Sequence, residues 1–213
     1  MNTTSTAKTA NQDAMQQRQQ AILQAASTIF AKHGYQAADV QKVADLAGVG
    51  KGTVYRHFES KEKLFRATLS KHLDCLREVV TQAQDAHEDP LAQLKAVWLA
   101  YLGYFDSNDE IVDLLRQEGA HFRDGEMSTY FVRLEENRDK WLSLFEAIQA
   151  RYPAKAGISA EDMMEISGQL VHGAVVLAQG SQLKRGLAER VDLMMKIFTS
   201  GFVSDEAQPN LAI

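Results

Sequence analysis

"GVGKGTVYRHF", residues 48 to 58, places three glycines at alternate positions just before a cluster of hydrogen-bonding and aromatic side chains. Glycine in a helix interior costs about 1 kcal/mol relative to alanine, so glycines at this spacing need a structural reason. A tight turn explains Gly48, because glycine readily adopts the left-handed backbone conformation. Gly50 and Gly52 leave little side-chain bulk where the next helix begins, so its backbone can approach another molecule closely.

The segments around this stretch are predicted to be short helices. Residues 21–33 carry apolar side chains at helical spacing and are followed by a glycine. Asp39 is a favourable N-cap for a second short helix, and a third helix runs through Phe58. With a turn at residues 47–49, these three helices form a helix-turn-helix, whose last helix enters the major groove of DNA.

The motif as a whole resembles one known family. "GVGKGTVYRHFESKEKLF", preceded by "ILQAASTIFAKHGY" and "VQKVADLA", is similar to the DNA-binding domain of the TetR/AcrR family of transcriptional regulators. The resemblance is close over about residues 18–66, and beyond them it is limited to helix pattern and size. It implies a dimer that binds double-stranded operator DNA and a small effector. The DNA-contacting positions that it implies are Gln41, Lys51, Gly52, Thr53, Tyr55, His57 and Lys61.

Two positions depart from the family pattern. The family usually has serine or threonine around the start of the second helix and at position 50, where this chain has Ala38, Asp39 and Gly50. Asp39 can still cap its helix, but its carboxylate repels phosphate. Gly50 removes a hydroxyl group. We therefore expect no direct DNA contact from the side chains at these positions.

Charge is divided unevenly along the chain. The net charge is −5, but residues 1–66 hold nine Lys/Arg and five Asp/Glu, whereas residues 67–213 hold fourteen Lys/Arg and twenty-three Asp/Glu. A basic first part suits a nucleic-acid-binding protein, because phosphate neutralisation supplies much of the affinity.

Composition also predicts where the protein works. No run of about 18 apolar residues is present, so no membrane span is predicted. The polar N-terminus lacks the apolar core of a signal peptide. Cys75 is the only cysteine, which excludes an internal disulfide and fits a reducing compartment. We therefore expect a cytoplasmic protein without a membrane partner.

Helical stripes continue through the second part of the chain, and no alternating strand pattern competes with them. We predict an all-α fold of about nine helices. The expected organisation is a flexible tail at residues 1–17, a helix-turn-helix domain at 18–66, an effector-binding and dimerisation domain at 67–205, and a C-terminal tail at 206–213.

Aromatic residues on three predicted helices of the second part suit an apolar pocket for a small molecule. Polar residues on the same stripes, such as Asn137, and His172 beside such a stripe could orient a ligand. The candidate effector-binding residues are Trp98, Tyr101, Phe105, Glu118, His121, Phe122, Tyr130, Asn137, Trp141 and His172.

Glu118 is the polar residue of most interest in this set. Its spacing from Ile111 and Phe122 predicts that it faces inward, with His121 close by. A buried carboxylate needs a partner, which can be a ligand or an internal salt bridge with Arg116, Arg123 or Arg133. The Glu118-x-x-His121 spacing also occurs in di-metal helical bundles, but no second such pair is evident.

The last two predicted helices are expected to form half of a four-helix bundle across a two-fold axis. A major-groove reader of this size also needs two copies for specificity. The predicted interface residues are Leu170, Gly173, Ala174, Leu177, Val191, Met195 and Phe198.

The leading interpretation is a repressor that a small aromatic or amphipathic effector releases from its operator, without a cofactor or bound metal. One alternative is a helix-turn-helix protein with no small effector. The other is a metal-dependent helical-bundle enzyme. No Ser/His/Asp set, GxSxG motif or phosphate-binding loop supports catalysis.

Overall fold

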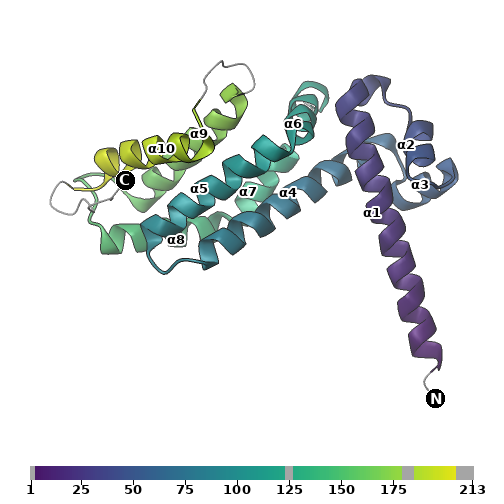
Figure 1. Ribbon diagram of the computed structural model, residues 1–213, viewed down its shortest axis with the longest axis horizontal. Coiled ribbons are helices and arrows are strands. Elements are labelled where there is room, and N and C mark those ends of the chain that lie inside the picture. The colour runs from purple at the N-terminus through teal and green to yellow at the C-terminus, as the bar shows by residue number, and fades with distance from the viewer. Residues whose placement is uncertain (1–2, 123–126, 179–184, 205–213) are drawn as a thin grey trace. The chain divides into compact units, whose positions relative to one another are not determined.

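The computed structural model describes residues 3–122, 127–178 and 185–204, and these confirm the all-α prediction (Figure 1). Apart from one isolated antiparallel bridge between Ala154 and Val203, the described residues outside helices are turns and loops. The helices are α1 (Thr3–Ala37), α2 (Val40–Leu46), α3 (Lys51–Phe58), α4 (Lys61–Asp85), α5 (Pro90–Ser107), α6 (Asp109–His121), α7 (Thr129–Glu136), α8 (Arg138–Arg151), α9 (Ala160–Ala178) and α10 (Leu187–Phe202).

The described residues form ten helices, one more than the sequence predicted. The apolar spacing of residues 130–148 predicts one long helix, but Asn137 divides this range into α7 and α8. Asn137 has φ −113° and ψ 9°, outside the helical region. Its side-chain amide donates to the carbonyl of Arg133 at 2.8 Å. Asparagine competes for nearby backbone groups in this way, and it therefore favours helix ends.

The predicted flexible tail at residues 1–17 is corrected by the structure, because α1 is already helical from Thr3. The alanines and glutamines of this segment are good helix formers, although it has no apolar stripe. The end of α1 agrees better with the prediction. Gly34 has φ 73°, so the backbone leaves the helical conformation at the residue expected to stop the helix. The predicted C-terminal tail, residues 206–213, lies outside the described residues.

The chain folds as two compact units, and Met1–Asp74 with Asp109–Phe131 form unit 1. Its core joins α1, α2, α4 and α6, and the Phe30 and Phe65 rings meet edge to face with centroids 5.1 Å apart. Gln117 of α6 donates its side-chain amide to the carbonyl of Phe30 at 3.2 Å. The predicted boundary at residue 66 placed α6 in the second domain, whereas α6 packs on α1 in unit 1.

Unit 2 consists of Cys75–Asn108 and Val132–Ile213. Its helices α5, α8, α9 and α10 pack against one another, and Figure 1 shows α9 and α10 side by side. Trp98 of α5 is buried at the centre of this bundle. The Trp98 ring meets the Phe198 ring edge to face, with centroids 5.8 Å apart. The Phe145 ring also packs near the Phe198 ring.

Asp89 caps the start of α5 in unit 2. Its Oδ1 accepts from the backbone N–H groups of Leu91 and Ala92, and its Oδ2 accepts from the Tyr152 hydroxyl at 2.6 Å. Burial acts to raise the pKa of Asp89, but these hydrogen bonds and Arg151 outweigh it and lower the pKa. The stabilisation is therefore present above the ordinary carboxyl pKa and is lost as the pH falls through the lowered value. Asp89→Ala should cost about 1–2 kcal/mol at neutral pH and less at acid pH, measured by urea unfolding.

Candidate nucleic-acid interface

The turn between α2 and α3 has the geometry that the sequence predicted. Asp39 caps α2, and its carboxylate accepts from the backbone N–H of Gln41 at 2.8 Å. Gly48 has φ 66°, a conformation that other residues adopt at a cost. Val43, Val54 and other apolar residues of α2 and α3 are buried, so the two helices pack on a common core.

The remaining face of α3 carries the predicted DNA contacts. Lys51, Gly52 and Tyr55 are exposed, whereas Thr53 and His57 are half-buried. No atom lies within 4 Å of the position that a Cβ on Gly52 would occupy. The start of α3 is therefore open to close approach, as its glycines suggested. Arg56, which the sequence interpretation did not select, is also exposed and donates to the Thr53 hydroxyl at 3.1 Å.

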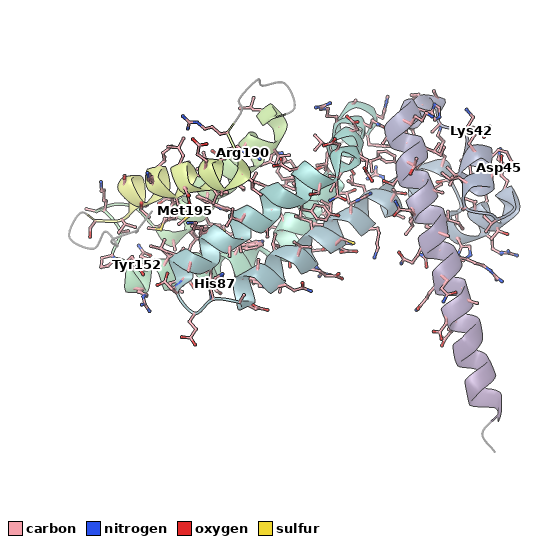
Figure 2. All side chains as sticks on the ribbon, in the orientation of Figure 1. Lys42, Asp45, His87, Tyr152, Arg190 and Met195 are labelled. Atoms are coloured by element: carbon pink, nitrogen blue, oxygen red, sulfur yellow. The ribbon has the colours of Figure 1, made fainter. Side chains whose placement is uncertain are left out.

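Gln41 is exposed on α2, where its amide donates to the Asp45 carboxylate at 2.7 Å. Figure 2 shows Asp45 and Lys42 on this helix, beside α3. Gln41 must exchange this hydrogen bond before its amide can read a base edge.

Lys61, the expected phosphate contact at the start of α4, is held against the end of α1. Its Nζ donates to the carbonyl of Gln36 at 3.0 Å and lies 5.1 Å from the centre of the Tyr35 ring. Burial lowers the pKa of Lys61, and the charge of Asp39 acts in the opposite direction. A fixed cation at a helix N-terminus is a suitable contact for a phosphate oxygen.

Asp39 places a negative charge beside the lysines that are expected to contact phosphate. The Lys51 ammonium lies 3.7 Å from its Oδ1. The hydrogen bond from Gln41 is the main cause that lowers the pKa of Asp39, and Lys51 and Lys42 lower it further. Asp39 is therefore ionised near neutral pH, and it competes with phosphate for the lysines around it.

Comparison with known proteins identifies the domain that this geometry describes. The family model for bacterial regulatory proteins of the tetR family matches residues 22–68, which include α2, α3 and the start of α4. Residues 22–68 therefore form a DNA-binding domain of the tetR-family type.

Two curated relatives illustrate the similarity. The chain is 33% identical over 135 residues to the HTH-type transcriptional repressor KstR2 of Rhodococcus jostii, over 61% of this chain and 64% of the relative. It is 36% identical over 94 residues to the HTH-type transcriptional activator FasR of Mycolicibacterium smegmatis, over 44% of this chain and 43% of the relative. The chain matches less than two thirds of the length of each of these relatives.

Solved structures of transcriptional regulators share the fold over most of the chain. The ketosteroid transcriptional regulator KstR2 of Mycobacterium tuberculosis superposes with a TM-score of 0.63 at 21% identity, covering 88% of this chain and 96% of that one. The fatty acid degradation regulator FadR of Bacillus halodurans gives a TM-score of 0.71 at 16% identity, covering 92% and 96%. The TetR-like fold therefore extends beyond the matched DNA-binding domain.

The salt dependence of DNA binding tests the assignment of α3. Lys51→Ala should weaken binding to every duplex and flatten the slope of log affinity against log salt by ~0.9, because one phosphate contact is lost. Adding Tyr55→Ala should weaken binding further without unfolding the protein, because this side chain is exposed. Titrations at several salt concentrations measure both effects. Lys140→Ala on α8 removes the same charge from unit 2 and should leave the slope unchanged. An unchanged slope in the double variant would contradict the assignment.

Asp39→Ser should strengthen DNA binding. Serine can still cap α2, while the charge that competes with phosphate is removed. We expect the affinity for non-specific duplexes to rise roughly two- to fivefold at low salt, with a smaller gain at high salt. Fluorescence anisotropy with a random-sequence duplex measures the change, and Asp85→Ser at the exposed end of α4 is the charge-matched control. Weaker binding by Asp39→Ser would mean that the carboxylate itself supports the interface.

Six of the ten candidate effector residues belong to unit 2. Trp98, Tyr101 and Phe105 are buried along α5, and the Tyr101 hydroxyl lies 3.3 Å from His172 Nδ1 on α9. Burial lowers the pKa of His172, so its imidazole is neutral near pH 7. Tyr101 and His172 therefore lie together in the interior of unit 2. Trp141 is half-buried on α8. The helical stripe that was expected to contain Asn137 is interrupted, because the helix breaks at this residue.

The other four candidates belong to unit 1. Glu118 and Tyr130 are buried, as expected. His121 is exposed, which corrects the prediction that it faces inward beside Glu118. It lies at the last residue of α6, where its Nδ1 is 3.5 Å from the Gln36 amide. Phe122 follows it, and its ring centroid lies 4.9 Å from that of Tyr35.

The predicted dimer interface needs a larger correction. Val191, Met195 and Phe198 of α10 are buried inside the protomer, so they cannot form a surface between two copies. The predicted residues of α9 (Leu170, Gly173, Ala174 and Leu177) are half-buried or exposed. Sequence reasoning missed the exposed apolar residues that accompany them, although their spacing of four residues on α10 was a usable signal. The exposed apolar residues of α9 and α10 are Ile166, Val176, Leu177, Leu193 and Ile197, here called the α9–α10 face.

Two further observations concern the metal site and the membrane span that were considered from the sequence. Within the described ranges, no group of three His, Cys, Asp or Glu side chains lies close enough to hold a metal ion. Among the described residues, no helix has both the length and the hydropathy needed to span a bilayer.

Proposed function

We propose that the chain is a transcriptional repressor that binds operator DNA as a homodimer in the cytoplasm and responds to a small effector. The observation that carries this proposal is the exposed side of α3, where Lys51, Gly52 and Tyr55 lie on a helix that a glycine turn positions. The match of residues 22–68 to the TetR-family model supports the same role. The curated relatives include repressors and an activator, and the repeated KstR2 matches favour repression.

The first test is selection of DNA. The purified full-length chain should enrich a palindromic or pseudo-palindromic duplex from a random-sequence pool, because the two recognition helices of a symmetric dimer read related half-sites. Cloned ahead of a reporter gene, the selected duplex should give lower expression when the chain is present. Enrichment of no sequence would exclude a specific regulator, and higher reporter expression would mean that the chain activates.

The α9–α10 face supports the proposed homodimer. Its five large apolar side chains are exposed in the protomer, and a cluster of this kind marks an interaction surface. No atom lies within 4 Å of the position that a Cβ on Gly173 would occupy, so a partner helix can approach the backbone of α9 closely. Leu193 and Ile197 lie four residues apart on α10, and Ile166 and Leu177 lie eleven residues, about three turns, apart on α9, so each pair shares one side of its helix. Apolar sides on two adjacent helices suit a four-helix bundle across a two-fold axis.

The effector is proposed to be an aromatic or amphipathic molecule, since the candidate residues are mainly aromatic with a few polar groups. Reciprocal coupling is the test. If the effector releases the repressor, operator DNA must weaken effector binding by the same factor as the effector weakens DNA binding, typically 5–150-fold. Titration of the effector against the tryptophan fluorescence of the protein, with and without operator, measures this factor. Equal effector affinity in both conditions would exclude such a switch.

A further inference from the structure

Glu118 has one carboxylate oxygen with no hydrogen-bond partner in the part of the chain that the structure describes. The residue lies in the last turn of α6 and is only 2% exposed. Its Oε1 accepts from the Thr129 backbone N–H at 3.0 Å and from the Thr129 hydroxyl. Its Oε2 is buried and makes no hydrogen bond with any residue that the structure describes. Such an atom costs free energy, because its hydration has been lost without replacement.

Of the three arginines considered as partners, Arg116 of α6 and Arg133 of α7 do not bind Oε2, and Arg123 lies outside the described residues. Arg116 pairs with Asp113 at 3.2 Å, and Arg133 pairs with Glu136 at 2.7 Å.

Thr129 explains why the free oxygen is held in one place. Both of its donors bind Oε1, so they join the start of α7 to the end of α6 and fix the orientation of the carboxylate plane. A carboxylate held in this way presents Oε2 to an incoming group without reorganisation, and preorganisation of this kind favours binding.

We propose that Glu118 binds a protonated nitrogen of the effector through Oε2. This inference rests on the proposed function, since it assigns a chemical class to the effector of the same regulator. A cationic N–H donor would both pair the buried charge and satisfy the free oxygen, and such charge-assisted bonds are about twice as strong as neutral ones. A neutral hydroxyl would supply the hydrogen bond but leave the charge unpaired.

Two ligands that differ only in their head group test this proposal on the full-length protein. Phenylbutylamine and phenylbutanol have the same aromatic chain, and only the amine is cationic at neutral pH. Calorimetry should give roughly 10–100-fold tighter binding of the amine to the wild type. Glu118→Gln keeps an oxygen for Thr129 but removes the charge, so the preference for the amine should fall to about one while the alcohol binds as before.

Two variants control for indirect effects. Glu135→Gln removes a charge from the exposed side of α7 and should retain the full preference for the amine. Glu118→Asp keeps the charge but withdraws it by one methylene, so an intermediate preference is expected even if Glu118→Gln folds poorly. Equal binding of both ligands by the wild type, no binding of the amine at millimolar concentration, or an unchanged preference in Glu118→Gln would each overturn the proposal.

DNA binding separates this proposal from the proposed function. Wild type and Glu118→Gln should bind the selected duplex equally in the absence of ligand, because Glu118 is buried in unit 1 away from the exposed side of α3. If both bind DNA but show no preference for the amine, only the assignment of Glu118 is wrong. If the wild type selects no duplex, the proposed regulator itself is wrong.

Discussion

Ile197→Glu should convert the dimer into monomers and abolish specific operator binding, while the protomer stays folded. Ile197 is 56% exposed in the protomer, so the glutamate remains hydrated when the chain is alone. In the proposed dimer the side chain is covered, and an unpaired buried charge costs several kcal/mol. Two-fold symmetry places each residue in the interface twice, so the penalty is doubled. We expect the dimer dissociation constant to rise by roughly a hundredfold or more.

Sedimentation equilibrium and thermal unfolding measure the two halves of this prediction. Val79→Glu on α4 is the matched control, because Val79 is also exposed and apolar but lies outside the α9–α10 face. The control should remain dimeric and bind the operator. A dimeric Ile197→Glu protein would show that the two copies meet on another surface. A wild type that is monomeric at micromolar concentration would exclude the homodimer itself.

Phe198→Ala should have the opposite consequence, although Phe198 is the next residue along the chain. Phe198 is 1% exposed, and its ring lies close to the rings of Trp98, Phe145 and Phe202. The centroids of the Phe198 and Phe202 rings are 5.0 Å apart. Truncating a buried phenylalanine leaves a cavity and costs about 3–5 kcal/mol. Because domains are stable by only about 5–15 kcal/mol, this change should remove a large part of the stability.

Urea unfolding of Phe198→Ala beside Ile197→Ala measures the contrast at low protein concentration, where dimerisation contributes least. Ile197→Ala should change the free energy of unfolding of the protomer by less than about 1 kcal/mol, since its side chain is already solvated. If Phe198→Ala dissociated the dimer at unchanged protomer stability, Phe198 would be an interface residue after all.

The helix-turn-helix could be predicted from the sequence because its signals are local. Gly48 marks a left-handed turn, and Asp39 stands at the start of α2 as a cap, where its carboxylate accepts a backbone N–H group. These features depend on a few neighbouring residues, so they survive without knowledge of the fold.

The division of α10 between core and surface could not be predicted in the same way. Val191, Leu193, Met195, Ile197 and Phe198 are all apolar, so the stripe has no polar edge that separates the buried side from the exposed one. Periodicity gives the faces of such a helix but not which face the rest of the protomer covers.

The environment of α6 also depended on contacts between distant parts of the chain. Phe122 and His121 pack on Tyr35, more than eighty residues earlier, and no local pattern announces that contact. Burial of Glu118 was predicted correctly from its helical spacing. Its bond to Thr129 was not predicted, since it crosses the connection between two helices.

In the proposed regulator, the carboxylate of Asp39 affects how the protein is divided among its operator, other DNA sequences and free solution. A DNA-binding protein spends most of its time on the vast excess of other sequences, and it slides and hops along them by contacts with phosphate alone. A negative charge among Lys42, Lys51 and Lys61 shortens each of these encounters. More of the molecules are then free in solution at any moment, and fewer copies per cell suffice to keep one operator occupied.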